Sequence, residues 1–202
     1  MALGDPYATL VELKTRLGIE DVGDDDQLDD ALETVSRGIE KFCRRQFNKA
    51  TTASARLFYP DRCAMAMVDD FHTTSGLLIA TDAGGDGTFE TLWSATDYEL
   101  HPLNGIADGD LGWPYYKIKA VRKAFPIGTD RASLQVTAQW GWAVVPGPVH
   151  TACLILAEEC FKLKDAPFGV AGFGEYGAVR VRQNPMAAAM LAPYRRDPVL
   201  VG

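Results

Sequence analysis

Near the start of the chain, hydrophobic residues recur at the three- and four-residue spacing of amphipathic helices. In the first such segment, Thr9 and Glu12 have the spacing of a capping box, in which each side chain satisfies a free amide of the first turn. Gly18 suits a left-handed stop after it. A second segment carries a longer apolar stripe, made by Leu28, Leu32, Val35, Ile39 and Phe42. The pattern therefore predicts two amphipathic helices within residues 1–47.

From about residue 51 the pattern changes to short segments rich in β-branched and aromatic residues, each bounded by Gly, Pro, Asp or Asn. These segments are 56–59, 64–68, 77–79, 89–93, 98–100 and 115–121. The segment 133–140 alternates apolar with polar residues, which is the period of a strand with one buried face. Gly84-Gly85-Asp86-Gly87 is typical of a hairpin turn. Residues from about 55 to 143 are therefore predicted to form an antiparallel β region, either a small sandwich or a curled sheet.

Helical spacing returns after this region. Pro148 suits the first turn of a third helix, which ends near Lys164. Its apolar stripe consists of Val149, Ala152, Cys153, Leu156, Ala157, Cys160 and Phe161. Residues 168–177 include four glycines and indicate an ordered loop or arm, and 179–182 alternate like an edge strand. Asn184 and Pro185 are predicted to cap a short final helix that runs to about Leu191.

Together these segments predict an α+β fold: a small bundle of about four helices with an antiparallel β region inserted between the second and third helices. Residues 1–50 and 146–202 are assigned to the helical core, with its glycine-rich arm and C-terminal tail. Residues 51–145 are assigned to the inserted β region.

Composition and charge narrow the function. Hydrophobic residues make up 47% of the 202 residues, enough for a core, and the net charge is −7. An acidic chain gains nothing from counterion release on a phosphate backbone, which argues against sequence-specific DNA binding. No apolar run approaches the roughly 20 residues that span a bilayer, and residues 1–6 lack the basic start and apolar run of a signal peptide. We therefore expect synthesis in a cytoplasm, reduced cysteines and no membrane partner.

The cysteine, histidine and aspartate residues of this chain lack the spacing that metal sites require. Cys153 and Cys160 share a helix face but are separated by about 10.5 Å along the axis, and no CxxC or HxxxH pattern accompanies them. Residues 24–26 are three aspartates without the alternating ligands, glycine and glutamate of an EF-hand. The sequence therefore predicts buried apolar thiols, a solvated helix-entry loop, and no metal or other cofactor.

Catalytic patterns are equally weak. His72 and His101 fall in turn-like parts of the β region, and His150 opens the third helix, where solvation accounts for it. No nucleophile elbow or phosphate-binding glycine pattern is present, so no catalytic residue is predicted. A hydrolase that uses Cys153 or His150 through a non-local pairing is one alternative. The aromatic residues Trp113, Tyr115, Tyr116, Trp140 and Trp142 are interpreted as filling a small β core, with sugar or base stacking as the competing interpretation.

Several ordered segments carry a family resemblance. They are 7–14 with Leu17-Gly18, 39–47 at the end of the second helix, the strand–proline–helix junction 136–156 with Trp140-Gly141-Trp142, and 165–180. As an ordered set, these segments resemble the head-to-tail connector (adaptor) family of long-tailed double-stranded DNA bacteriophages. The resemblance covers nearly the whole chain, although the β region is longer than a minimal family member needs.

The resemblance implies a structural virion protein that is not an enzyme. Members of this family form a ring, commonly of twelve copies, beneath the portal vertex of the filled head. The ring extends the DNA channel and provides a platform for stopper or tail-completion proteins. The implied partners are other copies of the chain, the portal protein and the stopper or tail protein, while DNA passes through without specific binding. The implied location is the head–tail junction of a virion assembled in the host cytoplasm.

The C-terminal part of the chain supplies the candidate partner-binding residues. Residues 1–145 carry 22 acidic and 14 basic side chains, whereas 146–202 carry 5 and 6. We therefore expect the arginine-bearing tail to dock on an acidic portal surface and the glycine-rich arm to reach a neighbouring copy; the alternative is that the arginines form a solvated edge. The candidate residues are Phe168, Phe173, Tyr176, Arg180, Arg182, Tyr194, Arg195 and Arg196.

A competing function belongs to a different class. In it, the chain is a virion decoration or tail-tip protein whose β region binds a host glycan through Trp113, Tyr115 and Tyr116. Stacking of a sugar ring on an exposed aromatic face is the physical basis of this alternative.

Overall fold

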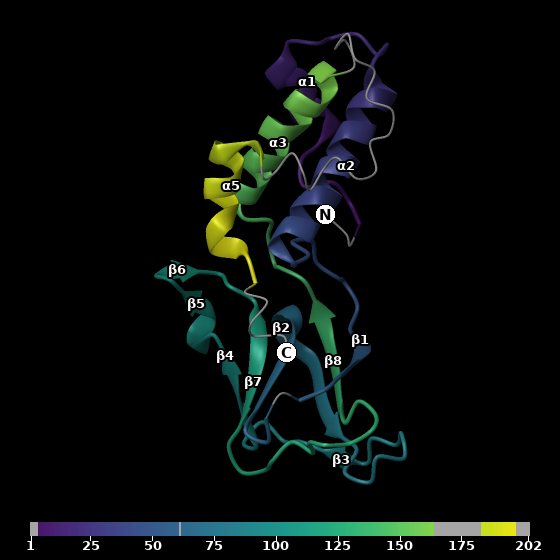
Figure 1. Ribbon diagram of the computed structural model, residues 1–202, viewed down its shortest axis with the longest axis vertical. Helices are drawn as coiled ribbons and strands as arrows, with labels where there is room; N and C mark the ends of the chain where they lie inside the picture. The colour runs from purple at the N-terminus through teal and green to yellow at the C-terminus, as the bar shows by residue number, and fades with distance from the viewer. Residues whose placement is uncertain (1–3, 61, 164–182, 197–202) are drawn as a thin grey trace. The chain divides into compact units, whose positions relative to one another are not determined.

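The computed structural model describes residues 4–60, 62–163 and 183–196 (Figure 1). These residues form two compact units. The helical unit contains the described residues of 4–48 and of 144–196, and the β unit contains those of 49–143. The predicted α+β class is confirmed, because the described chain holds helices α1, α2, α3 and α5 with an antiparallel sheet inserted between α2 and α3.

The first two helices follow the sequence pattern closely. α1 spans Leu10–Leu17 and begins at the predicted capping box, in which the Thr9 hydroxyl oxygen accepts from the Glu12 amide and the Glu12 carboxylate accepts from the Thr9 amide. Gly18 ends it in the left-handed conformation, with φ of 71°. α2 spans Asp25–Cys43 and buries the predicted stripe except Phe42, which is half-buried; Cys43 is buried at its C-terminal end.

The remaining helices complete the bundle. α3 spans Gly147–Lys162, with Pro148 in its first turn as predicted, and it packs against both α2 and α5. α5 spans Pro185–Leu191, and the Asn184 side chain caps it by accepting from the Ala187 amide at 2.9 Å. A 3-10 turn, Ala192–Tyr194, follows α5. The predicted edge strand at 179–182 lies outside the described residues.

The β unit is built around one antiparallel sheet with strand order β1-β8-β2-β7-β4, and β3 pairs with β2. The strands are β1 (Ser54–Phe58), β2 (Met65–Thr81), β3 (Thr91–Leu92), β4 (Tyr98–His101), β7 (Tyr115–Ala120) and β8 (Leu134–Trp140). Between β4 and β7, β5 (Ile106–Ala107) and β6 (Asp110–Leu111) form a separate two-stranded hairpin. The ends of the unit meet, because Lys49 bridges Gly141 and the Ala50 amide donates to the Trp140 carbonyl at 2.7 Å.

The longest strand corrects the sequence interpretation. The predicted strands 64–68 and 77–79 are the two ends of β2, whose first half pairs with β7 and whose second half pairs with β8. The prediction that His72 lies in a turn is therefore wrong, and His101 is the last residue of β4. The intervening polar run continues as a strand because Asp70 is satisfied inside the fold. Its carboxylate accepts from the Trp142 indole N–H at 3.0 Å, and its carbonyl accepts from the Gly141 amide at 2.6 Å.

One face of the curled sheet forms the core of the β unit. Its buried residues include Phe71, Ile118, Val136 and Trp140, and Trp93 stacks on Phe125 with ring centroids 4.5 Å apart. The interpretation of the aromatic residues as core is confirmed for Trp113, Trp140 and Trp142, which are all buried. Tyr115 and Tyr116 are half-buried.

The predicted hairpin turn at residues 84–87 joins β2 to β3 and depends on a residue that the sequence analysis missed. Asp82 is buried directly after β2. Its two carboxylate oxygens accept from the amides of Gly85 and Gly87, each at 2.7 Å. The carboxylate thereby replaces water as the acceptor for two loop amides.

Replacing Asp82 with Ala tests this loop. Because both amides lose a charged acceptor, we expect the free energy of unfolding of the β unit to fall by about 2 kcal/mol. Urea denaturation followed by tryptophan fluorescence measures the change. Asp130→Ala removes an exposed carboxylate and should stay within about 0.5 kcal/mol of the unmodified protein. Equal stability of the two variants would show that Asp82 does not hold the loop.

Candidate assembly site on the helical unit

Three of the predicted partner-binding residues lie in the described chain. Tyr194 is buried, with only 9% of its surface exposed, and its ring contacts the ring of Phe47 edge-on with centroids 5.9 Å apart. Arg195 is exposed and places its guanidinium 4.9 Å above the ring of Phe42. Arg196 is half-buried. Phe168, Phe173, Tyr176, Arg180 and Arg182 lie outside the described residues.

The tail docks on the C-terminal end of α2. Arg44 ends this helix in the left-handed conformation with φ of 54°, and the Arg196 amide donates to the carbonyl of Cys43 at 2.9 Å. A helix leaves its last carbonyls without intrahelical donors, so the tail supplies one of the missing partners. Tyr194 is therefore a packing residue of the helical unit, whereas Arg195 presents its charge at the surface.

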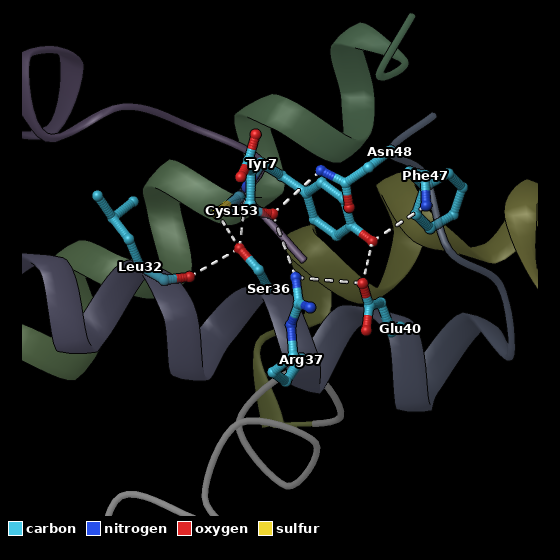
Figure 2. A network of polar contacts seen from close by, with 9 residues as sticks. Tyr7, Leu32, Ser36, Arg37, Glu40, Phe47, Asn48 and Cys153 are labelled. Atoms are coloured by element: carbon cyan, nitrogen blue, oxygen red, sulfur yellow. Dashed lines mark hydrogen bonds and ion pairs between the residues drawn. The ribbon is translucent and has the colours of Figure 1, made fainter. Parts of the chain in front are cut away.

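A network of buried polar contacts fixes the N-terminal segment to α2 (Figure 2). The Tyr7 hydroxyl donates to the Glu40 carboxylate at 2.6 Å and accepts from the Phe47 amide at 3.0 Å. The Tyr7 amide donates to the Ser36 hydroxyl oxygen at 3.0 Å. That hydroxyl in turn donates to the Leu32 carbonyl at 2.7 Å. One buried tyrosine thus links the start of the chain to the middle and the end of α2.

A second set of contacts in Figure 2 holds the backbone just before Tyr7. The Asp5 carbonyl accepts from the Arg37 guanidinium at 3.2 Å and from the Asn48 side-chain amide at 3.0 Å. Arg37 also lies 3.2 Å from the Glu40 carboxylate. Ser36 reaches α3, since its Oγ lies 3.5 Å from the Cys153 sulfur.

The environment of Tyr7 suits this structural role. Burial, and then donation to Glu40, raise the pKa of the phenol well above its usual value of 10. The hydroxyl therefore remains a neutral donor across the physiological pH range. A residue with these properties anchors a fold and is poorly suited to proton transfer near neutral pH.

His150 has a partner beyond the solvation expected for it. Its Nε2 lies 3.1 Å from Glu12 Oε1, which connects α1 to the first turn of α3. Hydrogen bonds from the Thr9 amide and hydroxyl, and then the His150 contact, lower the pKa of Glu12. Glu12 thus closes the capping box and joins two helices at once.

The cysteines of the helical unit are buried thiols, as predicted. Burial raises the pKa of Cys43 to about 12 and that of Cys153 to about 11. Since the thiolate is the nucleophile, a hydrolase mechanism at Cys153 is disfavoured. Within the described ranges, no group of His, Cys, Asp or Glu side chains is arranged to hold a metal ion.

Burial also lowers the pKa values of His72 and His101, with nearby Lys49 and Lys117 respectively acting in the same direction. Both histidines belong to strands of the β unit. Of the helices that the structure describes, none has the length and apolarity needed to cross a membrane.

The fold has counterparts among solved structures, although no protein-family model and no curated protein sequence matches the chain. A chain in the neck of an empty GTA particle, with C6 symmetry, superposes with a TM-score of 0.56 at 19% identity. A chain in the neck of the native GTA particle, with C12 symmetry, gives 0.52 at 16% identity, and one in the native gene transfer agent virion gives 0.51 at 18%. Each alignment covers 96% of this chain and 91% of the other. The chain therefore shares its fold with chains of phage-like neck and virion particles.

Changing Tyr7 to Phe tests the polar network. The Phe47 amide would lose its acceptor and the Glu40 carboxylate one of its donors, so we expect the helical unit to lose about 2 kcal/mol of stability. Amide exchange at Phe47, measured by NMR, should become faster by a factor of about 30 if this amide exchanges through unfolding of the unit. Tyr59→Phe removes an exposed hydroxyl in the β unit and should leave that amide unchanged. Equal protection of Phe47 in both variants would contradict the anchoring role of Tyr7.

The thiol pKa values predict a pattern of alkylation. At pH 8 the thiolate fraction is about 10⁻⁴ for a pKa near 12 and about 10⁻³ for a pKa near 11. Iodoacetamide should therefore modify the exposed Cys63 at least about 100-fold faster than Cys43 or Cys153. For the two buried thiols, the rate of labelling in the folded protein should rise from pH 7 to pH 9 without a plateau, since both pKa values lie above that window. Peptide mass spectrometry follows each site, and a plateau below pH 9 would contradict the raised values.

Proposed function

We propose that the chain is a non-catalytic structural subunit of a head–tail neck: a connector (adaptor) that forms a ring beneath the portal. In this role the ring extends the DNA channel and provides the attachment platform for stopper or tail-completion proteins. The supporting observation is the likeness to GTA neck chains, which extends over nearly the whole length of both aligned chains. The C6 and C12 symmetries of those necks support a ring, for which we infer twelve copies.

The chain's own properties agree with this proposal. A closed ring with cyclic symmetry needs two different surfaces on each subunit that fit one another. The net charge of −7 disfavours binding to DNA that moves through the channel. We assign residues 1–50 and 146–202 to the connector core and residues 51–145 to an inserted β module. The place of action is then the head–tail junction of the virion.

For portal binding we propose the arginines of the C-terminal part together with the glycine-rich arm. Arg195 supports this proposal, because its guanidinium is exposed while its position over Phe42 limits its conformational freedom. Tyr194 contributes indirectly, by packing on Phe47 and so fixing the start of the tail. Phe168, Phe173, Tyr176, Arg180 and Arg182 remain candidates from the sequence.

The glycan-binding alternative gains no support from two of the three aromatic residues on which it rests. Trp113 is buried against Trp142, with ring centroids 5.0 Å apart. Tyr115 packs on Phe71 at 5.5 Å. Neither arrangement offers the open aromatic face that a sugar ring needs.

Mixing the purified chain with the portal ring of the same particle tests the proposal. Electron microscopy and mass photometry should reveal a closed ring stacked coaxially on the portal. A chain that leaves the mass and the images of the portal unchanged at micromolar concentrations would overturn the connector function.

A tail variant tests the portal contact. Replacing Arg180, Arg182, Arg195 and Arg196 with Ala should weaken portal binding about 10-fold, since rim charge pairs contribute about 0.2–1 kcal/mol each. Biolayer interferometry at two salt concentrations measures the change. The matched control replaces Lys49, Arg62, Lys117 and Arg122 of the β unit with Ala and removes the same charge. Equal weakening by both variants would assign the effect to net charge instead of the tail.

A further inference from the structure

One side of the sheet of the β unit faces away from the core, and its charged and uncharged residues lie in separate parts of that side. Residues paired across antiparallel strands project from the same side, so the register identifies which residues share it. Since Val136 and Ile79 face the core, their neighbours in sequence face outward. Across β1, β8, β2 and β3, one outward row consists of Leu57, Gln135, Ala80 and Leu92, and the next of Ala55, Thr137 and Leu78. We call these seven residues the neutral face.

The neutral face is apolar, and its large side chains are open to solvent. Leu57, Leu78 and Leu92 are 55%, 58% and 65% exposed. No ionisable side chain belongs to either row, and the polar members, Gln135 and Thr137, are uncharged. Leu57 on β1 is separated from Leu78 on β2 and Leu92 on β3 only by uncharged side chains of β8 and β2. Exposed leucines grouped without any intervening charge are typical of an interaction surface.

The other half of the same sheet provides an internal comparison. Because Ile118 faces the core, Lys117 and Lys119 of β7 face outward, opposite His101 and Glu99 of β4. Lys119 Nζ lies 3.1 Å from the Glu99 carboxylate, so this half carries the charged pairs of an ordinary solvated surface. The absence of charge is therefore specific to the strands that make up the neutral face.

A second exposed apolar surface lies on the β5–β6 hairpin. Ile106 and Leu111 are directly opposite each other on its two strands and are 43% and 79% exposed, and Leu103 just before β5 is 55% exposed. The two strands pair with each other and not with the main sheet. A two-stranded hairpin is marginally stable alone, so an apolar pair left open on it indicates that another surface covers it.

The two surfaces belong to different parts of the β unit. The hairpin connects β4 to β7, which are the last two strands of the order β1-β8-β2-β7-β4. The neutral face occupies β1, β8, the second half of β2, and β3. One unit therefore carries two different apolar surfaces, each without a charged residue at its centre.

We propose that the neutral face of one copy binds the β5–β6 hairpin of a neighbouring copy. This inference rests on the proposed ring, because head-to-tail contact between two unlike surfaces is what closes a ring of identical chains. Leu103, Ile106 and Leu111 of one copy pack on Leu57, Leu78 and Leu92 of the next, which removes apolar area from water on both sides.

Charge fixes the direction of this contact. Asp108 and Asp110 lie at the turn of the hairpin, outside its apolar pair. At the β3 end of the neutral face, Lys123 Nζ donates to the Leu92 carbonyl at 2.9 Å and lies 3.1 Å from the Asp97 carboxylate. The hairpin turn points toward β3, where its two carboxylates share the lysine, while the apolar pair lies over Leu57 and Leu78.

Two variants of the full chain test the contact from its two sides. Leu78→Asp disrupts the neutral face and keeps the hairpin, whereas Leu111→Asp disrupts the hairpin and keeps the neutral face. In sedimentation velocity up to about 1 mM, the unmodified chain should self-associate and each variant alone should associate at least about 10-fold more weakly. Mixed together, the two variants should form a one-to-one dimer that does not grow, because each supplies the surface that the other lacks.

The controls separate docking from folding. Ile127→Asp changes an equally exposed apolar residue, 56% exposed in the loop before β8, and should leave association unchanged. Methyl NMR of each variant should keep the dispersed spectrum of the folded β unit. With the unmodified chain, the methyl signals of Leu57, Leu78, Leu92, Leu103, Ile106 and Leu111 should shift with concentration.

Three outcomes would overturn the proposal: no association and no methyl shifts at about 1 mM, self-association of either variant at the strength of the unmodified chain, or no dimer in the mixture. Portal binding is measured separately and distinguishes this inference from the proposed function. A chain that binds the portal but fails the mixing test retains the connector function and loses this interface. A chain whose two variants form a dimer in the mixture, but which does not bind the portal, retains this interface and loses the connector function.

Discussion

The helical unit depends on the requirement that buried polar groups be paired. Tyr7 meets it at both ends of the residue: its amide is satisfied by Ser36, and its hydroxyl bridges the Glu40 carboxylate and the Phe47 amide. The Phe47 ring also contacts the rings of Tyr7 and Tyr194, both edge-on. The start of the chain, the end of α2 and the beginning of the tail are therefore held by one cluster.

The β unit achieves stability in a different way. A single curled sheet encloses its core with one face, so its other face is free to take on different chemistry along its width. Charged pairs cover β7 and β4, while leucines, alanine and uncharged polar residues cover β1, β8 and β3. The buried Asp70 shows how the sheet tolerates an embedded carboxylate, because the Trp142 indole N–H donates to it and the Gly141 amide satisfies the backbone carbonyl of the same residue.

The parts of this fold that the sequence predicts are those with local causes. The capping box at Thr9 and Glu12, the Asn184 cap and the stripe of α2 each depend on residues within a few positions of one another. The long strand β2 was not predicted, because its polar middle has the composition of a turn. The contact that accommodates this segment joins Asp70 to Trp142, which is 72 residues away in the sequence. The contacts of Tyr7 with Ser36 and Phe47 span 29 and 40 residues and leave no periodic signal. For the tail, the arginines are visible in the sequence, but the burial of Tyr194 against Phe47 is not.

The closed base of the β unit has a consequence for evolution. Lys49 bridges Gly141, and the Ala50 amide bonds to the Trp140 carbonyl, so the chain enters and leaves this unit at neighbouring points. An insertion whose two ends already touch can lengthen, shrink or be exchanged for another module without altering the register of the helices on either side of it. Related lineages would then diversify by exchanging this β module while they inherit the same helical bundle.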